Sequence, residues 1–271
     1  MGSIKLKSFS SGSCGNCYFL GQEEDGRISA GVLIDAGVSL RRVKRELAAE
    51  GLGPDSFQAM LITHDHMDHI RSLGSFCKYL QKPVYATGTL HKALANNFFT
   101  QGYIASCRRV LKDEDWTEIV PGKIKAKYFV VPHDATQTVG YCIKIEDYTV
   151  VIITDAGEAV ATALECAATA DTVIIESNFD DYMLDHGPYP KVLRDRIRNG
   201  YGHLSNAKCA EAVRVFSHPG LRNVFLCHLS ENNNTPAEAH RCTREALDAI
   251  GRRDVRLVVL PRQLPSRLFD L

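Results

Sequence analysis

The sequence has no net charge, no long apolar run and no paired framework of cysteines. Its 32 Lys and Arg residues balance 32 Asp and Glu residues, so no global positive field attracts nucleic acid, and any phosphate binding has to be local. No uncharged apolar segment reaches the roughly eighteen residues that a membrane helix needs. Residues 1–9 carry two lysines without a following apolar stretch, so we expect no secretory signal, no membrane association and a cytoplasmic location.

The nine cysteines are odd in number and scattered from Cys14 to Cys242, which predicts reduced thiols instead of structural disulfides. One pair, Cys14 and Cys17, has C-x-x-C spacing. Because there is no second such pair and no nearby histidine, we favour free thiols in a glycine-rich turn over a zinc knuckle or a redox motif.

A content of 45% hydrophobic and 24% charged residues in 271 residues is typical of a globular protein. Short apolar runs alternate with amphipathic segments, and no linker separates them, so we expect one α/β domain over residues 1–271. The expected strands are 31–35, 59–63, 128–131, 148–154, 172–177 and 223–227. The expected helices are 40–50, 88–97, 159–168, 206–216 and 236–250, with Ser205 and Thr235 as capping residues of the last two.

Four of the expected strands end in a side chain of the kind that binds metal ions. His64 lies at the end of the strand 59–63, His133 follows 128–131 after one proline, Asp155 follows 148–154, and His228 follows 223–227. A single histidine after a strand is usually a polar residue leaving the core. Four such endings together indicate a site.

The densest group of such side chains is the segment 63–69, with the sequence THDHMDH. Three imidazoles and two carboxylates so close together are costly to bury unless each is paired or bound to a cation. Imidazole suits zinc, and added carboxylates make a site tolerant of harder ions such as manganese. There are too many donors for one tetrahedral ion, so the sequence predicts two divalent metal ions, Zn²⁺ or Mn²⁺.

These residues resemble the metallo-β-lactamase superfamily of hydrolases, in which an H-x-H-x-D-H motif follows an apolar strand. The resemblance implies a four-layer αββα sandwich, here a single domain without a large inserted clamp domain. It also implies how the ligands divide: His64, His66 and His133 hold one ion, Asp68, His69 and His228 hold the other, and Asp155 bridges them.

Within the superfamily, six short motifs are similar to the YycJ/WalJ-type branch. They are SSGSCGN at 10–16, LIDAG at 33–37, TDAG at 154–157, ESNFD at 176–180, GHLSN at 202–206 and HLSENN at 228–233. That branch is similar to nucleic-acid-processing members, including tRNA 3′-processing and RNase J-like enzymes, and has been linked to DNA exonuclease activity. Cys14 departs slightly from related sequences, which often have serine or another small residue there.

The predicted chemistry is phosphodiester hydrolysis, with a metal-bridging hydroxide as the nucleophile. Asp68 could orient that hydroxide or accept its proton. His203, in a turn before a helix, is the candidate proton donor to the leaving group, and the resemblance implies that Glu176 supports it. The alternatives are that His203 only makes a structural contact at the helix start, and that Glu176 only pairs with a nearby arginine.

A phosphate-binding surface has weaker support. Arg194 and Arg198 lie four residues apart on one face of an expected helix, and we assign them to substrate binding with Ser205 and Asn206. A second basic run at 41–45 is expected to face solvent.

The leading hypothesis is therefore a nuclease, with DNA favoured over RNA as substrate. The same fold hydrolyses small carbonyl substrates such as thioesters and lactones in other branches, although His203 and the arginines favour phosphate. A binding module without turnover is weakly supported, because all seven candidate ligands are present. The stretch between Asp155 and His228 is too short for a large clamp domain. Duplex ends or short single strands would therefore have to bind on an open face or with help from a second subunit of a homo-oligomer.

Overall fold

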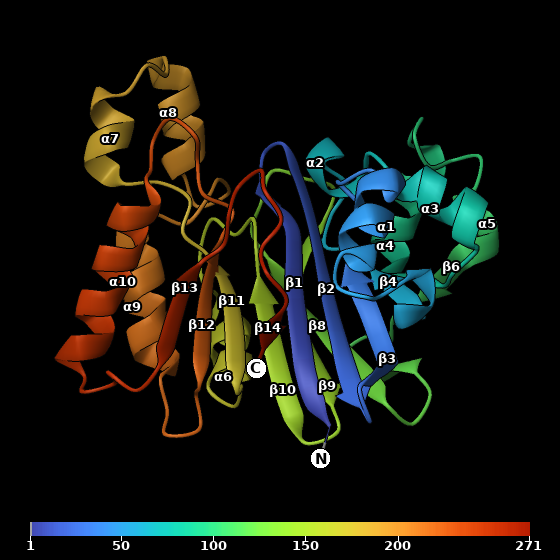
Figure 1. Cartoon of the computed structure of the whole chain (residues 1–271). Helices are drawn as coiled ribbons and strands as arrows, with labels where there is room; N and C mark the ends of the chain where they lie inside the picture. Colours follow the sequence, from blue (N-terminus) through green and yellow to red (C-terminus); the bar gives the residue numbers. More distant parts are fainter. Residues whose placement is uncertain (1) are drawn as a thin grey trace. The chain divides into compact units, whose positions relative to one another are not determined.

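The computed structural model describes residues 2–271, which form two seven-stranded mixed sheets flanked by helices (Figure 1). One sheet has the order β14-β1-β2-β3-β4-β5-β6, and the other has the order β13-β12-β11-β10-β9-β8-β7. The strands are β1 Ser3–Gly12, β2 Gly15–Glu24, β3 Arg27–Ile34, β4 Ala59–Leu61, β5 Val84–Ala86, β6 Arg108–Val110, β7 Thr117–Val120, β8 Ile124–Val131, β9 Thr138–Ile145, β10 Tyr148–Ile153, β11 Thr172–Glu176, β12 Asn223–Cys227, β13 Arg256–Val259 and β14 Phe269–Asp270. The helices are α1 Leu40–Ala48, α2 Met67–Ile70, α3 Leu73–Leu80, α4 Gly88–Asn96, α5 Ile104–Cys107, α6 Ala161–Ala167, α7 Asp181–His186, α8 Lys191–Arg198, α9 Asn206–Phe216 and α10 Pro236–Ala249, with a short 3-10 helix at Pro54–Ser56.

The chain divides into two compact units. The first contains the residues up to Tyr128, together with Ile143–Asp147 and Gln263–Leu271. In it, β1, β2 and β3 pair antiparallel and β3 to β6 pair parallel. Apolar side chains from the strands and from α1, α3 and α4, among them Leu33, Val43 and Phe76, form one buried cluster. The amphipathic pattern of these helices is thus explained by the sheet that they cover.

The second unit contains Phe129–Cys142 and Tyr148–Arg262. Strands β10, β11, β12 and β13 are parallel and are joined through helices, α6 after β10 and α10 after β12. Helices α9 and α10 lie side by side in this unit (Figure 1). Strands covered in this way are continuously apolar, and the carboxyl ends of parallel strands meet at one edge of the sheet. The register brings Glu176, the last residue of β11, opposite Cys227, the last residue of β12.

All six expected strands and all five expected helices are present, with boundaries shifted by a few residues. The main error concerns the start of the chain, where the expected turn around Cys14 and Cys17 is the tip of a long hairpin formed by β1 and β2. Cys17 lies buried within β2, and only the tip forms a turn. Glycine and serine are uncommon in strands, and both faces of this hairpin are largely buried, so no alternating pattern reveals it. All nine cysteines are free thiols, as predicted.

Both predicted helix caps are confirmed. The Ser205 side chain accepts a hydrogen bond from the backbone N of Lys208 at 3.2 Å, and Thr235 accepts one from the backbone N of Glu238 at 3.1 Å. Among residues 2–271, no helix has both the length and the apolar character needed to cross a membrane.

We expect Thr235→Ala to lower the free energy of unfolding by about 1 kcal/mol, because the first turn of α10 loses the acceptor for a backbone N–H. Thr235→Ser keeps the hydroxyl and should stay within a few tenths of a kcal/mol of the unsubstituted protein. Urea unfolding of the three proteins measures the difference. Equal stability of the alanine and serine variants would contradict the role of this cap.

Candidate metal centre

The first unit collects four candidate metal-ligand side chains just after β4. His64 and His66 lie on the loop that joins β4 to α2, and Asp68 and His69 lie in α2 itself. The His64 ring centroid is 4.7 Å from that of His66 and 4.0 Å from that of His69. His69 Nε2 lies 3.5 Å from Asp68 Oδ2. His64 and His69 are fully buried, whereas His66 and Asp68 are partly exposed. The predicted cluster is therefore a compact group with one accessible side.

A buried carboxylate orients His69. Asp35 Oδ2 accepts from His69 Nδ1 at 2.7 Å and from the Thr63 hydroxyl at 2.9 Å, and Asp35 Oδ1 accepts from the Thr63 backbone N at 2.8 Å. Because Nδ1 carries the proton, Nε2 keeps the lone pair that a metal ion needs. The side-chain amide nitrogen of Asn16 lies 2.9 Å from this Nε2 and 3.1 Å from Asp68 Oδ2.

Sequence reasoning gave Asp35 and Asn16 no role, although both lie in motifs that carry the family resemblance. The loop of Asp35 also packs closely on α2, since the backbone N of Ala36 donates to the His69 carbonyl at 2.7 Å. A Cβ at Gly37 would lie 1.6 Å from the Asp68 carbonyl oxygen, so only glycine fits there. The signal that could have found Asp35 is its position, since it follows a strand as Asp155 does.

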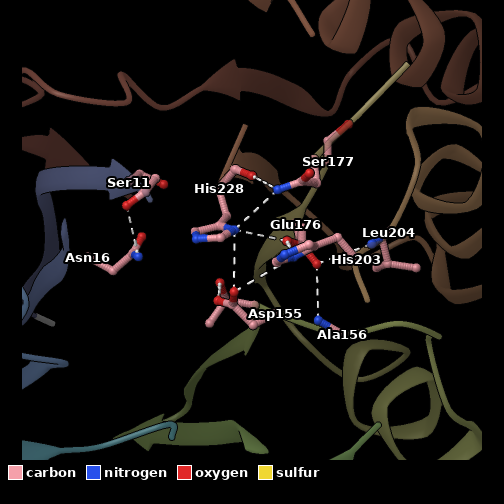
Figure 2. A network of polar contacts seen from close by, with 12 residues as sticks. Ser11, Asn16, Asp155, Ala156, Glu176, Ser177, His203, Leu204 and His228 are labelled. Carbon is pink, nitrogen blue, oxygen red and sulfur yellow. Dashed lines mark hydrogen bonds and ion pairs between the residues drawn. The ribbon is translucent and has the colours of Figure 1, made fainter. Parts of the chain in front are cut away.

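The second unit collects another group at the carboxyl edge of its parallel strands. Asp155 follows β10, Glu176 ends β11, His228 follows β12, and His203 precedes α9 (Figure 2). Each of these four residues offers one ligand atom within 4.8 Å of the others. Asp155 Oδ1 is 3.4 Å from His228 Nδ1 and 3.8 Å from His203 Nδ1. His133, which follows β8, places Nε2 3.9 Å from the same oxygen.

Glu176 lies between the two histidines that Figure 2 shows beside it. Its Oε1 accepts from His203 Nδ1 at 2.7 Å and from His228 Nδ1 at 3.0 Å. Its Oε2 accepts from the backbone N of Ala156 at 3.0 Å and of Leu204 at 3.2 Å. The side chain is fully buried, so these four donors replace the water that burial removed.

Glu176 and His203 shift the pKa of each other. Burial by itself would raise the pKa of Glu176, but the His203 charge and the two histidine hydrogen bonds outweigh burial and hold the pKa below the usual carboxyl value. Burial would lower the pKa of His203, but Glu176 raises it above the usual imidazole value. Both shifts have one cause, the attraction between the charged forms of His203 and Glu176.

The His133 ring is oriented by a backbone carbonyl instead of a carboxylate. Its Nδ1 donates to the Gly202 carbonyl at 2.8 Å, and burial lowers its pKa, so the ring is neutral with its lone pair at Nε2. A Cβ at Gly202 would lie 2.1 Å from the Ile197 carbonyl oxygen, which explains the glycine in this turn. Asn178 fixes the loop after β12 by donating to the His228 carbonyl at 2.8 Å.

The four residues assigned to substrate binding make contacts within the protein. Arg194 Nη1 donates to the Asp185 carbonyl, and Arg198 Nη2 donates to Asp185 Oδ1 at 2.8 Å, so both connect α8 to α7. Ser205 caps α9, and buried Asn206 accepts from the Ser177 hydroxyl at 2.6 Å. Their part in substrate binding stays a prediction.

The donor sets fit divalent metal ions. The candidate ligands offer imidazole nitrogens and carboxylate oxygens, the atoms that Zn²⁺ and Mn²⁺ accept. His69, His133 and His228 each have Nδ1 bonded to a protein oxygen, which puts the lone pair at Nε2. This arrangement around a ligand histidine is usual in metal sites.

Comparison with known proteins decides the family. A sequence model of the beta-lactamase superfamily domain matches residues 31–229. This chain belongs to the metallo-β-lactamase superfamily. Exodeoxyribonuclease WalJ of Streptococcus pneumoniae serotype 2, strain D39, is 31% identical over 237 residues, which cover 88% of this chain and 86% of that protein. Exodeoxyribonuclease YycJ of Bacillus anthracis is 28% identical over 248 residues, covering 92% and 90%.

The solved structures agree on the fold. The metallo-β-lactamase fold protein YhfI of Bacillus subtilis matches with a TM-score of 0.70 at 14% identity, covering 97% of this chain and 99% of that one. The predicted metallo-β-lactamase fold is therefore confirmed, as is the predicted YycJ/WalJ-type branch of the superfamily.

We expect Asp35→Asn to weaken divalent-metal binding about 10- to 100-fold, because an amide cannot accept from His69 and both Thr63 donors as the carboxylate does. Asp25→Asn, at the exposed β2–β3 turn, is the control and should bind metal normally. Competition with a chromogenic chelator measures the affinity, and circular dichroism checks the fold. Unchanged affinity in a folded Asp35→Asn protein would show that His69 needs no carboxylate partner.

Proposed function

We propose that this protein is a metal-dependent phosphodiesterase that hydrolyses nucleic acid, acting as a DNA exonuclease in the cytoplasm. The names of its relatives, both exodeoxyribonucleases, support the reaction and favour DNA over RNA. Nine free cysteines are compatible with a reducing compartment. We propose that residues 1–271 form one hydrolase domain.

The proposed metal centre is dinuclear and takes Zn²⁺ or Mn²⁺. His64, His66 and His133 would hold one ion, Asp68, His69 and His228 would hold the other, and Asp155 would bridge them. The imidazole orientation described above supports this assignment, because three of the six single-ion ligands have a proton acceptor fixed at Nδ1. When bound, two such ions supply an activated water and neutralise charge on the phosphoryl group.

The environment of His203 favours hydrolysis of a phosphodiester over hydrolysis of a carbonyl substrate. Its Nδ1 is bonded to Glu176 Oε1 at 2.7 Å, and its side chain is 22% exposed, whereas that of His228 is 4% exposed. An imidazolium held by a carboxylate at one nitrogen can give the proton at the other to a leaving alkoxide. Carbonyl substrates such as thioesters have less need of a separate proton donor, so this pair favours a phosphodiester.

The remaining roles follow from position. Asp68, with its carboxylate partly exposed and held by Asn16, would orient the attacking water or accept its proton. Arg194 and Arg198, with Ser205 and Asn206, stay candidates for contacts with the nucleic acid. The two arginines would have to exchange contacts with Asp185 for contacts with phosphate.

We expect His203→Ala to lower kcat about 100-fold or more while metal content stays normal, because only the proton donor is lost. His66→Ala should lose metal and activity together. Metal content measured by mass spectrometry, with exonuclease rates on 5′-phosphorylated duplex DNA, single-stranded DNA and RNA in Mn²⁺ and in Zn²⁺, separates the two effects.

His240→Ala, on α10, is the matched histidine control and should keep both properties. A thioester and a lactone are assayed in parallel. Rapid cleavage of either, with no cleavage of nucleic acid, would replace the nuclease by a carbonyl hydrolase. Loss of metal from His203→Ala would contradict the division between ligand and proton donor.

A further inference from the structure

A basic cavity lies beside the hairpin tip that carries Asn16. It has a volume of about 440 Å³, and its lining combines two arginines with polar and apolar side chains. The lining residues are Ser10, Cys14, Arg42, Arg45, Gln263, Leu264 and Pro265, and none of them is acidic. All of them belong to the first unit.

Helix α1 supplies the two cations. Leu40, Val43 and Leu47 of this helix are buried in the core, and Arg42 and Arg45, three residues apart, are directed to the cavity. Arg42 Nη2 donates to the Gln263 carbonyl, which holds the guanidinium at the cavity wall. Arg42 Nε is buried and has no acceptor among residues 2–271, so the donors that face the cavity are those of its terminal nitrogens.

Arg45 is only partly neutralised. Its Nε and Nη2 donate to the carboxylate of Glu46, at 2.9 and 2.6 Å, and that residue does not line the cavity. The side chain of Arg45 is 72% exposed, and a guanidinium has five N–H donors. Donors of both arginines therefore remain for an anion, and a guanidinium matches the geometry of phosphate.

The cavity lies near two candidate metal ligands, Asp68 and His69, because the hairpin tip contacts both the cavity and these residues. Cys14 lines it, and Asn16, two residues later, contacts Asp68 and His69. Two residues span at most about 7 Å. Arg71, the residue that follows α2, donates to the carbonyls of Cys14 and Gly37, so the hairpin tip is fixed on the segment that carries Asp68 and His69.

We propose that this cavity binds a backbone phosphate of the DNA strand next to the cleaved bond, with Arg42 and Arg45 as its cationic partners. The apolar wall suits the sugar that adjoins such a phosphate, since Leu264 is 70% exposed. The inference rests on the proposed function and extends it, because it places a substrate subsite on α1, where the sequence indicated only a solvent-facing basic run.

The same helix provides a matched control. Arg41 and Lys44 are also three residues apart and cationic, and neither lines the cavity. The double variants Arg42→Ala/Arg45→Ala and Arg41→Ala/Lys44→Ala therefore remove the same charge from the same helix. Their comparison separates the subsite from the general electrostatic attraction of DNA.

The test measures binding of a fluorescent, phosphorothioate-capped single strand by anisotropy, and turnover of bis(p-nitrophenyl) phosphate. We expect the Arg42/Arg45 variant to raise Kd about tenfold and to lower the slope of log K against log salt by about 1. Turnover of the small phosphodiester should stay within about twofold, since it lacks the neighbouring phosphate. The Arg41/Lys44 variant should change Kd by less than about threefold.

A second measurement uses the unsubstituted protein. Cys14 is the exposed thiol among nine cysteines, of which Cys242 is half-buried and the others are buried. The oligonucleotide should slow alkylation of Cys14 severalfold, and inorganic phosphate should compete only at much higher concentration.

The outcomes are distinct. Equal Kd for the two double variants, or alkylation of Cys14 that DNA does not slow, would refute the subsite. Protection by inorganic phosphate as effective as that by DNA would make the cavity a site for the free ion instead. An unsubstituted protein that cleaves neither DNA nor bis(p-nitrophenyl) phosphate would refute the proposed function.

Discussion

The carboxylate of Glu176 is the contact on which the polar edge of the second unit depends. It lies without solvent exposure and accepts from two histidines and two backbone N–H groups. Those donors come from the loop after β10, the turn before α9 and the loop after β12, so one side chain fixes three segments that are far apart in the sequence. A buried carboxylate with fewer partners would cost several kcal/mol. Its four donors therefore have to stay in place together, which gives the edge its rigidity.

Backbone strain occurs where three buried strands end, one in the first unit and two in the second. Asp35, Asp155 and His228 follow β3, β10 and β12 and have φ values of 61°, 51° and 53°. This left-handed region is uncommon for residues other than glycine, although Asp and His adopt it more often than most. Conformations of this kind cost about 1–3 kcal/mol each and persist only where surrounding contacts enforce them. Here the contacts are the hydrogen bonds of the three side chains. The strain is thus the cost of ending a buried strand abruptly with its polar side chain at the sheet edge.

The sequence predicted β4, β8, β10 and β12 because an apolar strand followed closely by histidine or aspartate is easy to recognise. It did not predict β1 and β2, whose glycine and serine residues conceal a long hairpin. Nor did it predict Asp35 or Asn16, whose meaning lies in contacts with His69, 34 and 53 residues away along the chain. Arg194 and Arg198 show the reverse case. Helical spacing correctly put them on one helix, but it could not show that both contact Asp185.

One arrangement recurs at three of the five candidate ligand histidines, and it explains why spacing alone could not assign roles. A carboxylate orients His69, a backbone carbonyl orients His133, and Glu176 orients His228, each through Nδ1. His203 uses the same nitrogen and the same Glu176 oxygen as His228 does. The partner therefore does not distinguish a ligand from a proton donor. The difference lies in exposure, 22% against 4%, because a group that delivers a proton to a leaving alkoxide has to be reached by the substrate, whereas a ligand does not.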